Sequence, residues 1–203
     1  MKIAILVEGT TEVAFRAKLR DFLQTRLAGK MPQIKFIPQD GRIPKEGKLK
    51  RLVENLLSGQ SAYDAVIALT DVYTGTKDFK DAKDAKTKMM DWVGNNPQFY
   101  PHAALHDFEA WLLPYWSTIQ KIAKHNRSVP SVSPETVNHN KPPAFHLKEI
   151  FHLGKVKEDY NKPIHGKKIL EKEDLMLAIQ ACPELKAFIN QIISLCDSSK
   201  VIP

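Results

Sequence analysis

The chain contains 203 residues, a length that suits one domain or one domain with an appendage. Its hydrophobic content of 43% and charged content of 26% are those of an ordinary soluble globular protein. No run approaches the roughly 20 consecutive apolar residues that a membrane-spanning helix needs. Met1-Lys2 leads directly into a strand-like run, without the features of a signal peptide. We therefore expect a cytoplasmic protein with no membrane partner.

The chain is basic, with a formal net charge of +7. A charge of this sign favours a polyanionic partner, but it is equally compatible with ordinary solubility. Its two cysteines, Cys182 and Cys196, lie in an apolar helical pattern. That position favours buried free thiols over a disulfide or a zinc site.

The first half of the chain alternates strand-like and helix-like patterns, which is typical of βαβ units and a mainly parallel sheet. The first helix is expected to begin at Thr10 or Thr11 and to end at Gly29, and a second carries leucines at helical spacing between Leu49 and Leu57. Four strands are expected, at residues 3–7, 34–37, 65–70 and 101–105.

The second half has a different character. A helix is predicted from Asp107 to Lys124, bent at Pro114, and a long surface loop follows at residues 126–143. Short helical segments without strand patterns come next, at residues 142–153, 166–173, 175–181 and 183–195. We therefore predict an α/β domain at residues 1–125 and a helical C-terminal appendage or subdomain at residues 126–203, packed on or beside the sheet.

Three of the apolar runs end abruptly on acidic residues. Glu8 follows the first run, Asp71 follows the run at 65–70, and the sequence His106-Asp107-Phe108-Glu109 follows the last. In a parallel α/β sheet, ligands bind beyond the carboxyl ends of the strands. Carboxylates placed there from several strands are oxygen ligands of the kind that Mg²⁺ requires. The alternative is that each acid caps a helix or lies in its first turn, but three such acids together favour a metal site.

The individual acids differ in how well capping explains them. Capping accounts for Glu12, one helical turn after Glu8, but not for Glu8 itself, which stands where an apolar strand ends. Asp71 could hydrogen-bond the turn that follows it, although a neighbouring Glu8 favours a metal ligand. His106 and Glu109 share a helix face at i and i+3, where they could complete a metal shell or act as general base and phosphate donor. A structural role for this pair is equally open.

Two sets of basic residues are candidates for phosphate contacts. The first, in or after the loop that follows the second strand, comprises Arg42, Lys45, Lys48, Lys50 and Arg51. The second lies in the C-terminal half, where Lys162 and His165 beside Gly166 are the best candidates to reach an active site. Stacking aromatics are scarce among these basic residues, so the pattern gives no sign of sequence-specific base reading.

The run Val7-Glu8-Gly9-Thr10-Thr11-Glu12, with an acid at the end of the third strand, resembles the Toprim fold. Topoisomerases, primases and nucleases of the overcoming-lysogenization-defect (OLD) type share that fold, in which a glutamate and a later Asp-x-Asp pair hold Mg²⁺. Glu8 matches the glutamate and Asp71 the first aspartate, whereas Tyr73 stands in the place of the second.

A longer set of motifs resembles a bacterial family of uncharacterised Toprim-like proteins, often encoded beside ATPases in defence loci. Its stretches span almost the whole chain: Val7-Glu8-Gly9, Thr70-Asp71-Val72-Tyr73, Leu105-His106-Asp107-Phe108-Glu109-Ala110, Asn140-Lys141-Pro142-Pro143 and Tyr160-Asn161-Lys162-Pro163-Ile164-His165-Gly166. The resemblance implies a Toprim-like, Rossmann-like α/β fold with a mainly parallel four-stranded sheet flanked by helices.

The leading hypothesis is a nuclease that depends on Mg²⁺ or Mn²⁺ and acts as an effector in anti-phage defence. Glu8, Asp71 and Glu109 would bind the metal, with Glu12 and His106 completing the catalytic set. Nucleic acid would be held by Lys50, Arg51, Lys162 and His165.

The rival hypothesis is a non-catalytic Toprim-like module that binds an ATPase partner and transmits a signal. Tyr73 in place of an acid supports it, because a lost carboxylate weakens a two-metal site. Primase-like nucleotidyl transfer ranks last, because the chain has no obvious companion domain to hold a template.

Overall fold

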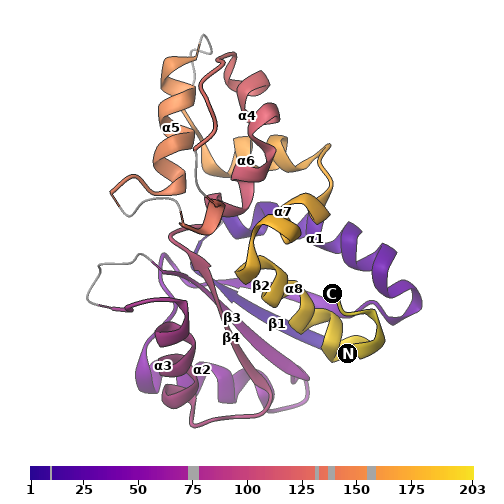
Figure 1. Ribbon diagram of the computed structural model, residues 1–203. Helices are drawn as coiled ribbons and strands as arrows, with labels where there is room; N and C mark the ends of the chain where they lie inside the picture. The colour runs from indigo at the N-terminus through magenta and orange to yellow at the C-terminus, as the bar shows by residue number, and fades with distance from the viewer. Residues whose placement is uncertain (10, 73–77, 131–132, 137–139, 155–158) are drawn as a thin grey trace.

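The computed structural model describes residues 1–9, 11–72, 78–130, 133–136, 140–154 and 159–203, without the side chains of residues 11–14. Four parallel strands form one sheet in the order β2-β1-β3-β4 (Figure 1). They are β1 (Lys2–Val7), β2 (Gln33–Pro38), β3 (Ala65–Val72) and β4 (Phe99–Leu105). All four predicted strands and the predicted α/β class are therefore confirmed.

The register of the strands brings their carboxyl ends to one edge of the sheet. Val7 of β1 lies opposite Leu69 of β3, and Asp71 of β3 lies opposite Ala104 of β4. The ladder extends one residue further, because the His106 backbone N–H donates to the Val72 carbonyl at 3.0 Å. Glu8, Asp71 and His106 consequently emerge at the same edge.

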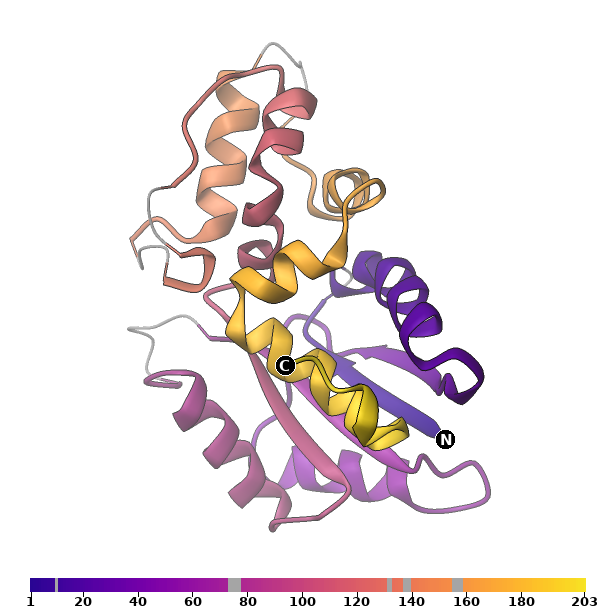
Figure 2. The same ribbon diagram turned by 45° about the vertical axis from the view of Figure 1, so that its right-hand side comes forward.

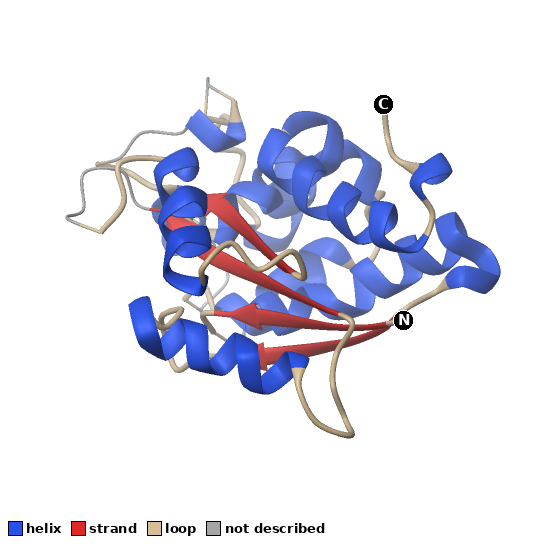
Figure 3. Ribbon diagram, turned by 90° about the horizontal axis from the view of Figure 1, so that it is seen from below, coloured by secondary structure: helices blue, strands red, loops and turns tan. Residues whose placement is uncertain are grey.

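Helices cover both faces of the sheet, as Figure 3 shows. On one face lie α2 (Glu46–Leu57) and α3 (Ala82–Val93), packed on inward side chains such as Ala4 and Leu6. On the other lie α1 (Thr11–Leu27) and α8 (Pro183–Cys196), over Ile3, Ile5 and Val7. Every residue from Ile3 to Val7 is fully buried, as expected of a central strand in a parallel sheet.

The segment after β4 differs from the prediction of one bent helix over residues 107–124. A 3₁₀ helix, η2 (Phe108–Tyr115), comes first, and the α-helix α4 (Trp116–Ala123) follows it. Pro114 lies inside η2 and has no backbone N–H to donate, so a continuous α-helix would lose a hydrogen bond there. The prediction of helical structure over residues 107–124 is thus confirmed for residues 108–123, whereas the 3₁₀ geometry of η2 was not predicted.

The remaining helices are α5 (Pro143–Leu153), α6 (Lys162–Leu170) and α7 (Leu175–Ala181). Two further 3₁₀ turns, η1 (Ala28–Lys30) and η4 (Ser198–Lys200), follow α1 and α8. The helix predicted at 166–173 begins earlier, because the Asn161 side chain accepts the Ile164 N–H at 3.1 Å and caps α6. Lys162 and His165 therefore lie in the first turns of a helix rather than in a loop before it.

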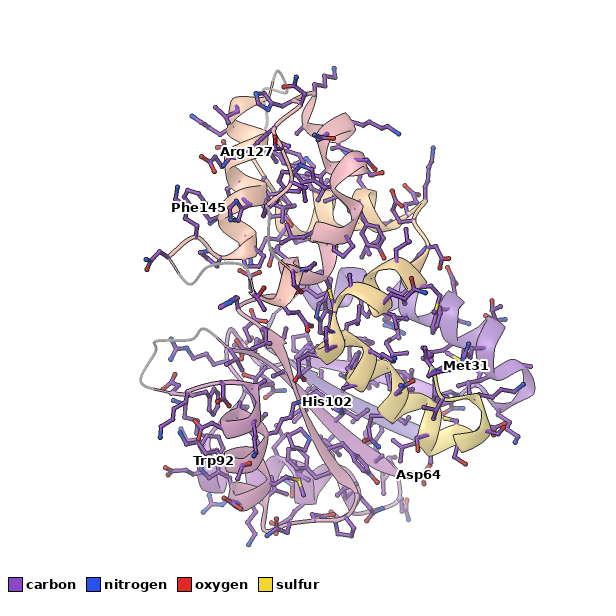
Figure 4. All side chains as sticks on the ribbon, in the orientation of Figure 1. Met31, Asp64, Trp92, His102, Arg127 and Phe145 are labelled. Atoms are coloured by element: carbon purple, nitrogen blue, oxygen red, sulfur yellow. The ribbon has the colours of Figure 1, made fainter. Side chains whose placement is uncertain are left out.

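The C-terminal helix α8 is part of the layer that covers the sheet. Figure 2 shows it lying along β4, and the Phe188 ring lies 5.7 Å from the ring of His102, which is labelled on β4 in Figure 4. One hydrophobic core joins β1 and α1 to Phe188, Ile189 and Ile192 of α8. This core spans the predicted boundary at residue 125, and the division into residues 1–125 and 126–203 stays a prediction.

Within the loop predicted at 126–143, Glu135 fixes the described part of the segment to the core. It lies in the short 3₁₀ helix η3 (Pro134–Thr136) and is only 5% exposed. Its carboxylate accepts hydrogen bonds from Trp111 Nε1 at 3.2 Å and from the backbone N–H groups of Glu184 at 3.0 Å and Leu185 at 3.3 Å. Glu135 thus satisfies the first turn of α8 and connects it to η2.

Replacing Glu135 with Ala should lower the free energy of unfolding by about 2 to 4 kcal/mol, because two buried donors and one partly buried donor lose their acceptor. Urea denaturation would measure the change. Glu135→Gln keeps one acceptor oxygen and should cost less, and Glu171→Ala on the exposed surface serves as a control. Equal midpoints for Glu135→Ala and the unmodified chain would contradict this role for Glu135.

Candidate active site

The carboxylate of Glu8 at the end of β1 is held against the end of β3. Its Oε1 accepts hydrogen bonds from the Thr70 hydroxyl and, at 3.2 Å, from the Asp71 backbone N–H. Thr70 is buried, whereas Glu8 and Asp71 are half-buried. The two acids predicted from separate strand ends are thus brought together, and Thr70 links them.

The loop after β2 is fixed against Glu8 by backbone hydrogen bonds. Gly41 N–H donates to the Glu8 carbonyl at 2.7 Å, and Gln39 N–H donates to the Val7 carbonyl at 2.8 Å. Gly41 has φ +99°, a conformation that favours glycine. Ile43 is 6% exposed and anchors the loop in the core, so the backbone on both sides of Arg42 is held in place.

A cavity of about 270 Å³ lies between this loop and the ends of β1 and β3. Glu8, Thr70 and Asp71 line it from the strand ends, Arg42 and Lys45 from the loop, and Asp78 from the segment before α3. Lys50 and Arg51, predicted to contact phosphate, are exposed residues of α2 and do not line it. The cations that line this cavity are therefore those of the loop itself.

A second acidic group follows β4. Asp107 and Glu109 are both fully buried. Both Glu109 oxygens accept from the Lys162 ammonium, at 3.0 and 3.1 Å, and the Tyr160 hydroxyl donates to Glu109 at 3.4 Å. Asp107 Oδ2 accepts the Ala144 N–H at 3.2 Å, whereas Oδ1 has no hydrogen-bond partner within the described part of the chain.

The buried charges alter one another's protonation. Burial, followed by the negative charge of Glu109, raises the pKa of Asp107 to about 7. Burial alone would lower the pKa of Lys162, but the carboxylate of Glu109 outweighs it, with help from Asp107 and Asp71, so that pKa is raised. Because Asp71 is among the charges that act on Lys162, the acids after β3 and those after β4 belong to one electrostatic neighbourhood.

The two predicted histidines are buried, each only 2% exposed. His106 ends the β4 ladder with φ +67°. His165 packs its ring 4.4 Å from that of Phe151, and its Nδ1 accepts the Asn161 N–H at 2.8 Å. This arrangement gives His165 a place in the packing of α6. The side chain of Glu12 lies outside the described residues, so its predicted role stays a prediction.

The described residues contain no group of three His, Cys, Asp or Glu side chains that could hold a metal ion. Glu109, predicted as a ligand, instead pairs with Lys162 through both oxygens. Glu8 and Asp71 remain as two carboxylates beside one cavity. This donor set suits Mg²⁺, which typically takes one or two protein carboxylates together with water and substrate phosphate.

Comparison with known proteins adds a family and a fold. A family model described as "Domain of unknown function (DUF4276)" matches residues 7–193. The chain belongs to this DUF4276 family. None of the curated proteins matches it. Its structure is similar to the C-terminal region of the Burkholderia pseudomallei OLD protein, with a TM-score of 0.52 and 11% identity over 98% of each chain. At that identity the likeness shows the α/β fold alone.

Sequence reasoning missed the part that Asp107 plays in this DUF4276 protein. Its place in the run His106-Asp107-Phe108-Glu109 was visible, but it was considered only as a helix cap. No side-chain capping bond forms at η2, and Asp107 instead contacts the start of α5 at Ala144. That contact joins residues 37 positions apart, which a local pattern does not reveal.

The raised pKa of Asp107 predicts a specific dependence of stability on pH. Asp107 holds its proton more tightly in the folded chain than in the unfolded chain, where its pKa is 3.8. The resulting stabilisation is complete at a pH below the pKa of Asp107 in the unfolded chain. It is lost as the pH rises through the folded pKa of about 7. Asp107→Asn cannot ionise, so its stability relative to the unmodified chain should improve by about 2 to 3 kcal/mol between mildly acidic and mildly basic pH.

Urea denaturation of both chains across this pH range would measure the difference. Asp64→Asn, at the opposite end of β3, provides the control. A difference between Asp107→Asn and the unmodified chain that stays constant with pH would contradict the buried, protonated Asp107.

Proposed function

We propose that this protein is a phosphodiester-cleaving enzyme of the nuclease type that depends on Mg²⁺ or Mn²⁺. The observation that carries the proposal is the meeting of Glu8 and Asp71 at adjacent parallel strand ends, in one cavity with Arg42 and Lys45. Carboxylates bind a hard cation, and the neighbouring cations suit a phosphodiester.

In this proposal Glu8 and Asp71 bind the metal, and the Thr70 hydroxyl orients Glu8. When bound, the metal would stabilise negative charge on the phosphate and activate a water molecule. Lys162 would neutralise the substrate strand, held in place by Glu109. His106 would move a proton at the end of β4. Glu12, one turn after Glu8 in the sequence, is retained as a further candidate acid.

A Toprim assignment and a role in anti-phage defence, with nucleic acid as substrate and an ATPase as partner, belong to the same proposal. Their support is the sequence resemblance through Val7-Glu8-Gly9, Thr70-Asp71 and the later motifs. No helix among the described residues has the length and apolar character to cross a membrane.

The alternative function is a non-catalytic module that binds a partner protein. Tyr73 in the place of a second aspartate favours it. Glu109 favours it too, because it pairs with Lys162 rather than joining the other acids in a metal-binding group. Such a module would bind neither Mg²⁺ nor Mn²⁺ specifically, so a metal titration separates the two functions.

Glu8→Gln combined with Asp71→Asn should abolish specific binding of Mg²⁺ and Mn²⁺ in calorimetry. It should also reduce metal-dependent cleavage on the order of a hundredfold or more, because metal stabilisation of the transition state is worth several kcal/mol. Glu54→Gln combined with Asp64→Asn removes the same charge from α2 and from the opposite end of β3, and should leave both unchanged. Cleavage and metal binding that survive in the first double variant would refute the assignment.

A further inference from the structure

Two cations of the β2–α2 loop converge on one carboxylate beside the Glu8 and Asp71 acids. Arg42 Nη1 lies 3.2 Å from Asp78 Oδ2, and Lys45 Nζ lies 2.5 Å from Asp78 Oδ1. A third cation, Lys88 of α3, donates to the Asp78 backbone carbonyl at 3.1 Å. The cations reach Asp78 from two different segments, and Arg42 and Lys45 reach different oxygens of its side chain.

The same residues line the cavity at the strand ends. Arg42, Lys45 and Asp78 share that lining with Glu8 and Asp71. With the Asp78 carboxylate in place, the positive charge of this wall is partly neutralised. If the carboxylate turned away, two positive charges would face the cavity next to the two acids, which is the arrangement that a phosphate between a metal ion and the protein requires.

The Asp78 side chain can be exchanged for another anion without rearranging the backbone. Gly41 and Ile43 hold the loop that carries Arg42. Phe79 is 8% exposed and, with Lys88, holds the chain at Asp78. The Arg42 and Asp78 side chains are 78% and 33% exposed, and ion pairs this accessible to water contribute little to stability. A phosphate group carries oxygens of the same kind and can take the place of the carboxylate.

We propose that Arg42 and Lys45 form a binding site for a backbone phosphate of a nucleic-acid strand, and that Asp78 occupies this site until the strand displaces it. Asp78 thus acts as an internal competitor of the substrate. The choice of a nucleic-acid strand as ligand rests on the proposed function, whereas the anion site itself rests on the three side chains.

The test is the affinity for a short fluorescent single-stranded oligonucleotide, measured by anisotropy in EDTA so that no metal contributes. Removing the competitor by Asp78→Asn should tighten binding roughly fivefold, because two phosphate-binding cations become available. Adding Arg42→Gln and Lys45→Gln to Asp78→Asn should reverse the gain. The salt dependence of the binding constant should then correspond to the release of about two fewer counterions. Inorganic phosphate should compete more strongly with the Asp78→Asn protein than with the unmodified chain.

A matched control corrects for the change in net charge. Asp197 pairs with Lys30 at 2.9 Å, away from the cavity, so Asp197→Asn frees a cation elsewhere. It should leave the affinity unchanged. Equal gains from Asp78→Asn and Asp197→Asn would overturn the site, as would weaker binding by a folded Asp78→Asn protein or no binding by any variant.

The measurement separates this inference from the proposed function. If Asp78→Asn binds the oligonucleotide more tightly, but neither metal binding nor cleavage depends on Glu8 and Asp71, the anion site stands and the proposed enzymatic function is refuted. Metal-dependent cleavage that requires Glu8 and Asp71, with Asp78→Asn showing no gain, would refute the anion site alone.

Discussion

The parallel register between β1 and β3 is the constraint on which the candidate site depends. It places Val7 opposite Leu69, so the next residue of each strand, Glu8 and Thr70, meet at the end of the sheet. The Glu8 carboxylate then accepts from Thr70 and from the Asp71 backbone. A shift of one residue would turn these side chains to opposite faces, and no acidic pair would form. The buried core on both faces of β1 prevents such a shift.

The acids beyond β4 create a different physical problem. Asp107 and Glu109 are completely buried; Lys162 pairs with Glu109, and its charge also acts on Asp107. Burying two carboxylates beside one ammonium is costly, and protonation of Asp107 reduces that cost. Lys162 is also affected by the charge of Asp71, so the acids beyond β3 and beyond β4 act on the same cation.

Much of the fold could be predicted because its determinants are local. Runs such as residues 3–7 and 65–70 are apolar on both faces, and the acids that follow them mark their ends. The meeting of Glu8 with Asp71 followed from those strands. The pairing of Glu109 with Lys162 did not, because it joins residues 53 positions apart through a helix whose start depends on Asn161. Lys50 and Arg51 were also predicted to hold nucleic acid, but Arg42 and Lys45 are the basic residues that line the cavity.

The position of α8 in the layer over the sheet has a consequence for folding during synthesis. Phe188 packs against His102 of β4 and against Trp111, so this face of the sheet receives part of its cover from a helix that follows all four strands in the sequence. A nascent chain that already contains all four strands still exposes the apolar surface that α8 will bury. Long-range closure of this kind slows folding and leaves an aggregation-prone intermediate. The cover of the sheet is therefore complete only after α8 has been synthesised, and a chaperone that shields this surface would act in the interval between β4 and α8.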